Sequence, residues 1–124
     1  MDVSRAFLVI GALYLVAGIA LGMYMGASQD RSLASLHAHV NLVGFVLGVV
    51  FALVYRVFPE MGATALARLH FWLHQVGGLL LTICLYLLLS QTVAEGTIGP
   101  VMAVFEAVVW IGVLVFTWNA LRRA

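Results

Sequence analysis

The residues of this chain best suited to chemistry are two histidines in the stretch Leu36-His37-Ala38-His39-Val40-Asn41, where a long apolar run begins. Histidine is a common metal ligand and the usual axial ligand of a b-type haem. At about 100° per residue, positions i and i+2 of an α-helix point about 200° apart. We therefore expect His37 and His39 to serve sites on two different sides of one helix, because a regular helix cannot bring both to one ion.

The composition predicts an integral membrane protein. Of the 124 residues, 65% are hydrophobic and 9% are charged. A small soluble domain buries only about 60–70% of its surface and could not cover so much apolar area. The net charge of +1 and the absence of an extensive arginine cluster give no indication of nucleic-acid binding. The single cysteine, Cys84, cannot form an intrachain disulfide and is expected to be a packing residue.

Four apolar segments have about the 20 residues that a helix needs to cross a bilayer. Short polar turns separate them, so that sequential helices must be antiparallel neighbours. The sequence therefore predicts an all-α, four-helix up-down bundle in a single domain, in contact with the lipid bilayer. The expected spans are residues 6–27, 36–58, 69–90 and 98–121.

The arginines indicate how these helices are oriented. Only Arg31 lies in a turn on one side of the predicted bundle. Because arginine is enriched in cytoplasmic segments, both termini are expected to be cytoplasmic, in the inner membrane of a bacterial or archaeal cell. The arginines on the other side are Arg5, Arg56, Arg68, Arg122 and Arg123.

A second histidine pair lies at the beginning of the third predicted helix. His70 and His74 are at positions i and i+4, so they share one face and could bind one metal ion, a haem or a quinone. The alternative is a structural role at the inner interface, with hydrogen bonds to the carbonyls of Arg56 or Arg68. At about 1.5 Å per residue, this pair lies roughly 20 Å from His37 and His39, which excludes one four-histidine site within a protomer.

Two further polar residues are candidates. Asn41 follows the first histidine pair and could orient an imidazole through its free nitrogen, or could form a hydrogen bond between helices. Glu106 is the only carboxylate well inside a predicted span, which makes it a candidate for proton passage or for pairing. The alternative for Glu106 is a hydrogen-bonded structural role.

Between His37 and Gly78, several short motifs occur in an order found in one known family. In this stretch the chain resembles a helical hairpin of haem-copper oxidase subunit I, whereas its outer helices match only in being apolar. The motifs are His37-Ala38-His39-Val40, Gly44-Phe45, Tyr55-Arg56-Val57-Phe58-Pro59, Gly62, Leu69-His70-Phe71 and Gly77.

This resemblance implies a cofactor and an assembly. In the family, a His-x-His pair ligates two haems on opposite sides of its helix, toward the outer half of the membrane. The family's twelve core helices form three four-helix arcs, and a low-spin haem is held by histidines from two different arcs. This chain has the length of one arc, so that a homotrimer would form a similar ring. His37 of one protomer and His39 of its neighbour would then hold one b-type haem.

The departures from the family are equally informative. The family's copper centre uses two adjacent histidines, and this chain has no such pair. It also has no histidine-to-tyrosine spacing typical of the oxygen-reducing site. Oxygen reduction is therefore not expected. We expect haem binding with electron transfer, or a redox reaction with a small gas, a quinone or a redox protein. The alternative is a non-enzymatic copper-delivery, assembly or structural subunit of a respiratory complex.

Overall fold

The computed structural model describes all 124 residues, Met1–Ala124, and they form helices joined by short turns. Four helices are long and apolar enough to cross a membrane, which confirms the predicted all-α class and the four spans. The second span, Ala34–Val57, is divided into three segments. The elements are α1 (Val3–Ser28), α2 (Ala34–His39), the π-helix η1 (Val40–Val46), α3 (Leu47–Val57), the short α4 (Pro59–Gly62), α5 (Ala65–Leu89) and α6 (Glu95–Arg123).

Capping side chains explain where two of the long helices begin. The Asp2 carboxylate accepts a hydrogen bond from the backbone N–H of Arg5 at 3.0 Å, so that α1 begins at Val3. The Thr64 hydroxyl accepts one from the N–H of Ala67 at 3.0 Å, and α5 begins at Ala65. The third span thus begins earlier than the predicted residue 69, because the Thr64 cap places Arg68 inside the helix.

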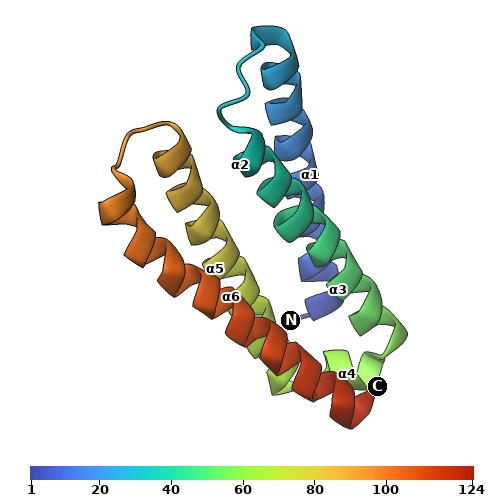
Figure 1. Cartoon of the computed structure of the whole chain (residues 1–124). Helices are drawn as coiled ribbons and strands as arrows, with labels where there is room; N and C mark the ends of the chain where they lie inside the picture. Colours follow the sequence, from blue (N-terminus) through green and yellow to red (C-terminus); the bar gives the residue numbers. More distant parts are fainter.

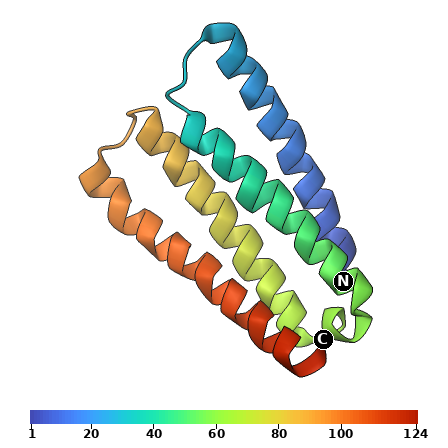
Figure 2. The same cartoon turned by 45° about the vertical axis from the view of Figure 1, so that its right-hand side comes forward.

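The four spans form an open, curved row. Figure 2 shows them next to one another in chain order, with α1 and α6 at the two edges. The up-down order is as predicted, but α1 and α6 do not come together to close a compact bundle. Both chain termini and α4 lie at one end of the molecule, here called the terminal end (Figure 1). The turns at residues 29–33 and 90–94 lie at the opposite end, the loop end.

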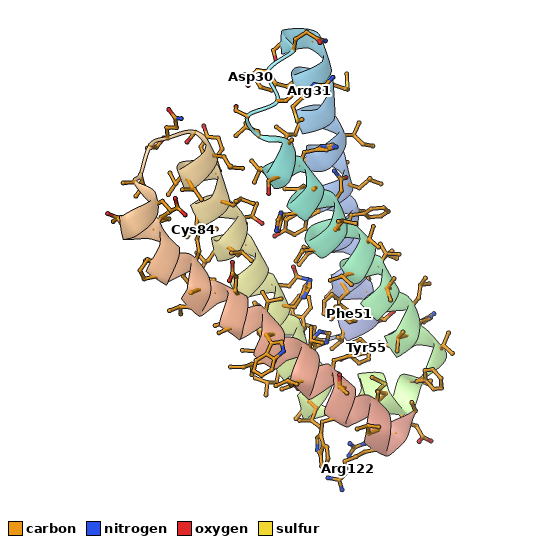
Figure 3. The ribbon with its side chains drawn as sticks, in the orientation of Figure 1. Asp30, Arg31, Phe51, Tyr55, Cys84 and Arg122 are labelled. Atoms are coloured by element: carbon orange, nitrogen blue, oxygen red, sulfur yellow. The ribbon has the colours of Figure 1, made fainter.

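A cluster of aromatic side chains joins all four spans in the half of the molecule nearer the terminal end. The Phe7 ring of α1 lies 5.1 Å from the Phe71 ring of α5, and the Phe51 ring of α3 lies 4.8 Å from the Phe116 ring of α6. Phe51 and Tyr55 are labelled on α3 in Figure 3. Burying these rings stabilises the row where its helices converge.

Glycines allow α5 and α6 to approach each other closely. A Cβ atom on Gly77 would lie 2.9 Å from Val108 Cγ1, and one on Gly112 would lie 3.2 Å from the Leu73 Cβ. The rest of α6 is largely uncovered, since only 11% of its most apolar stretch is buried inside the chain. These apolar outer surfaces are consistent with contact with a lipid bilayer.

Candidate functional site

His39 is exposed and held by its own helix. Its Nδ1 lies 2.7 Å from the carbonyl oxygen of Ser35, one turn earlier in the chain, and donates a hydrogen bond to it. That bond fixes the hydrogen on Nδ1 and leaves the lone pair on Nε2. A ring nitrogen that donates to a carbonyl while the other stays free is the usual arrangement of a metal-binding histidine.

His37 points to a different side of the same helix, toward α1. A Cβ atom placed on Gly22 would lie only 2.9 Å from its Cε1 atom, so the imidazole packs over this glycine. The predicted divergence of the two side chains is thus present: one ring lies against α1 and the other is exposed.

Asn41 contacts His37 directly. Its Nδ2 donates to the His37 carbonyl oxygen at 2.8 Å and lies 3.3 Å from the His37 Nδ1. Turning the amide would place Oδ1 against that carbonyl, so Nδ2 is the group that faces the ring. His37 Nδ1 therefore accepts, and its hydrogen is on Nε2. Gly18 of α1 makes room for the Asn41 amide, which a side chain at that position would displace.

The π-helix η1 begins directly after His39. Its backbone hydrogen bonds join residues five apart instead of four apart as in an α-helix, and such segments are frequent at functional sites. Val40 and Gly44 are its buried residues, and the Tyr14 ring of α1 packs over Gly44. The histidine-bearing α2 and the packing face of α3 are thus separated by a change in helical winding, where the apolar pattern predicts one regular helix.

The turn that precedes α2 carries a negative charge at the loop end. The Asp30 carboxylate accepts a hydrogen bond from the backbone N–H of Ser32 at 2.9 Å. This bond lowers the pKa of Asp30 below its ordinary value, so the carboxylate stays ionised at neutral pH. Arg31 adds a positive charge beside it, as Figure 3 shows.

The second histidine pair lies in the interior of the chain. His70 and His74 are 0% and 3% exposed and belong to the aromatic cluster. The expected bonds to the carbonyls of Arg56 or Arg68 are not formed. The cause is the phase of α5, whose inward face includes both histidines together with Ala67.

Each buried imidazole has one ring nitrogen in a hydrogen bond and one without a partner. The Tyr55 hydroxyl and the His70 Nδ1 are hydrogen-bonded at 2.8 Å, and the His74 Nε2 donates to the carbonyl oxygen of Val43 at 3.0 Å. His70 Nε2 and His74 Nδ1 are buried and have no hydrogen-bond partner. Buried polar atoms without partners are rare in native structures, and these two lie on rings whose centroids are 5.9 Å apart.

Glu106 is exposed on α6 and forms neither a hydrogen bond nor an ion pair within the chain. The alternative of a hydrogen-bonded structural role therefore has no partner for Glu106 within the chain. The physical reason is again the phase of the helix, because the residues that α6 buries lie on another side of it: Ile98, Gly112 and Asn119.

Several residues that shape these sites were missed from the sequence. Gly18 and Gly22 provide the space for Asn41 and His37, and their G-x-x-x-G spacing in an apolar helix was a readable signal of close packing. Asn119 is fully buried, and its Nδ2 donates at 3.0 Å to both the Met61 carbonyl and the Thr64 hydroxyl. No sequence signal pointed to this bridge between α6 and the α4–α5 turn.

The candidate residues thus form separate sites. His37 and Asn41 lie together, His39 is exposed beside them, His70 and His74 are buried elsewhere, and Glu106 is on the outer surface of α6. No three His, Cys, Asp or Glu side chains come close enough to form one metal centre. No protein-family model matches this chain, and searches of curated proteins and of solved structures also find no match.

Proposed function

We propose that this chain is a haem-binding membrane protein that resembles one arc of haem-copper oxidase subunit I and works in one-electron transfer. The observation that carries the proposal is the exposed imidazole of His39, with its Nδ1–H donated to the Ser35 carbonyl. A b-type haem bound there would supply an iron that takes up and releases one electron. The Ser35 carbonyl would keep the ring oriented and make its Nε2 a stronger electron-pair donor to the iron.

The two histidines of the motif fit a haem unequally. His39 has its lone pair on the exposed side, as an axial ligand requires. His37 carries its hydrogen on Nε2, because its Nδ1 accepts from Asn41. For His37 to ligate through Nε2, the Asn41 amide must turn away and give up its 2.8 Å bond to the His37 carbonyl. His39 is therefore the primary ligand in this proposal, and His37 of a neighbouring copy is the second.

The proposed assembly is a homotrimer with both termini in the cytoplasm of a bacterial or archaeal cell. The orientation rests on arginine, since five of the six arginines lie near the terminal end and one lies at the loop end. The assembly rests on the open row of helices, whose two edges carry no covering element. A quinone or a redox protein is the proposed electron partner.

The test is a reduced-minus-oxidised spectrum of the purified protein and of two variants. The wild type should show the sharp α-band of a low-spin b-type haem, at about one haem per protomer. His39→Ala should lose most of the bound haem. His37→Ala should keep part of it but change it to a high-spin spectrum, because one of two axial ligands is missing.

The matched control is His74→Ala, which removes an imidazole from the buried cluster and should leave the α-band in place. If His39→Ala keeps the wild-type spectrum, or if the wild type is colourless after haem supplementation, the proposal is wrong. If His37→Ala keeps a low-spin spectrum, His39 remains a ligand and the assignment of His37 is wrong.

A copper-holding role is the second candidate, and the free nitrogens of the buried pair favour it. His74 donates from Nε2 to Val43, which leaves the Nδ1 lone pair available, and His70 Nε2 has no partner either. Imidazole nitrogens suit copper. Metal analysis of the same preparations separates the candidates: copper that is lost in His74→Ala and retained in His39→Ala supports copper holding.

A further inference from the structure

Three polar side chains lie deep in the spans and have no partner within the chain. They are Tyr14 on α1, Gln75 on α5 and Glu106 on α6. Tyr14 and Gln75 precede the loop-end termini of their helices, Ser28 and Leu89, by 14 residues each. Glu106 follows the loop-end terminus of α6, Glu95, by 11 residues. At about 1.5 Å per residue, all three lie within about one helical turn of the same depth.

Tyr14 and Gln75 line the same groove. It lies between α1 and α5, has a volume of about 320 Å³, and its other lining residues are apolar: Ile10, Leu13, Ala17 and Leu79. The groove opens on the outer surface, since Leu13 is 63% exposed and Leu79 is 50% exposed. Its walls suit an occupant with a mostly apolar surface. Tyr14 and Gln75 can form hydrogen bonds with a polar group of that occupant at mid-membrane depth.

Glu106, in contrast, needs a polar partner. A carboxyl group exposed in the middle of an apolar helix is costly in lipid and faces protein or water in membrane proteins. The surface of α6 on the same side as Glu106 is apolar and uncovered, and includes Trp110 and Leu114. This helix therefore has a face that requires both apolar burial and hydrogen-bond donors, which is what the groove between α1 and α5 provides.

We propose that α6 of one copy packs into the α1/α5 groove of a second copy, where the Glu106 carboxyl group bonds to the Tyr14 hydroxyl and the Gln75 amide. Because the two surfaces of this contact are different parts of the chain, the contact is heterologous and can be repeated around a closed ring. Figure 2 shows α6 and α1 at opposite edges of the row. The inference deepens the proposed homotrimer and is independent of the proposed haem.

Cross-linking in native membranes tests this contact. Two differently tagged copies, both with Cys84→Ala to remove the only native thiol, are expressed together. One copy carries Glu106→Cys and the other Gln75→Cys, and a short, membrane-permeant bis-maleimide joins thiols that lie close together. We expect a cross-linked heterodimer with both tags.

The matched control is Val104→Cys, paired with the same Gln75→Cys copy. Val104 is 58% exposed, close in depth to Glu106, and about 200° away from it around α6. We expect little product from this pair. Equal yields from both pairs, or no product from either, overturn the proposal; the second result would leave the groove to a lipid or another apolar molecule. Efficient linking of Glu106→Cys to itself also overturns it, because that product requires a symmetric contact.

A substitution series provides a second readout. Glu106→Gln keeps the hydrogen-bonding groups and should retain self-association, whereas Glu106→Leu should weaken it by about three- to twentyfold, as expected from the loss of interhelical hydrogen bonds. Unchanged association of Glu106→Leu contradicts the proposed role of the carboxyl group. A cross-linked oligomer without haem supports this contact while refuting the cofactor, and a haem protein without the cross-link does the reverse.

Discussion

A graded set of glycine substitutions in α1 tests how the first histidine pair is positioned. Gly22 and Gly26 lie one turn apart on the same helix, but their surroundings differ. A Cβ atom on Gly22 would lie 2.9 Å from the His37 Cε1 atom, whereas one on Gly26 would have no neighbour within 4 Å. Carbon atoms pack best at about 3.5–4.0 Å, so the Gly22→Ala variant must displace the imidazole.

The expected magnitude follows from two opposing effects. Alanine is favoured over glycine in a helix by about 1 kcal/mol, and Gly26→Ala should therefore be neutral or stabilising by up to that amount. Gly22→Ala gains the same helix preference but must fit a methyl group against His37, and overpacking costs about 1–3 kcal/mol. We expect Gly22→Ala to be about 1–3 kcal/mol less stable than Gly26→Ala.

Gly18→Ala extends the series, because its new Cβ atom would collide with the Asn41 amide, whose Cγ lies 2.7 Å away. It should be the least stable of the three, since Asn41 would also lose its 2.8 Å bond to the His37 carbonyl. The assay is reversible unfolding in mixed detergent micelles, followed by circular dichroism. Equal free energies of unfolding for Gly22→Ala and Gly26→Ala would refute the inward packing of His37.

Two further substitutions test the polar contacts of the terminal half. Tyr55→Phe leaves His70 Nδ1 buried without its 2.8 Å partner and should lower the free energy of unfolding by about 1–3 kcal/mol, whereas Tyr24→Phe, at an exposed position, should change nothing measurable. Asn119→Leu removes two hydrogen bonds of 3.0 Å and should cost a similar amount, whereas Thr117→Val, which loses a bond only to its own helix, should cost less. Both are measured by the same unfolding assay, and a variant as stable as its control would contradict the contact.

The membrane spans were predictable because the local composition of the chain indicates them. An apolar run of about 20 residues between polar turns indicates a membrane helix without any knowledge of its neighbours. The predicted start of the third span is late because α5 begins after Thr64, a favourable N-cap residue, and includes Arg68. The π-helix was not predictable in this way, since residues 40–46 are typical of any apolar helix.

The candidate site was predictable only in part. The interval between His37 and His39 was enough to show that they diverge, because this depends on helix geometry alone. The burial of His70 and His74 depends on which face of α5 meets the other helices, and their partners Tyr55 and Val43 belong to another span. A single sequence without a known packing arrangement contains no direct record of such contacts.

The shared location of the two termini has a consequence for how such a protein can grow. An even number of spans brings the chain back to the end where it started, and the helix row leaves its first and last members at opposite edges (Figures 1 and 2). Copies could therefore be concatenated into one polypeptide by short linkers that never cross the bilayer. Such a fusion would free each repeat to diverge, so that identical pockets could acquire different chemistries.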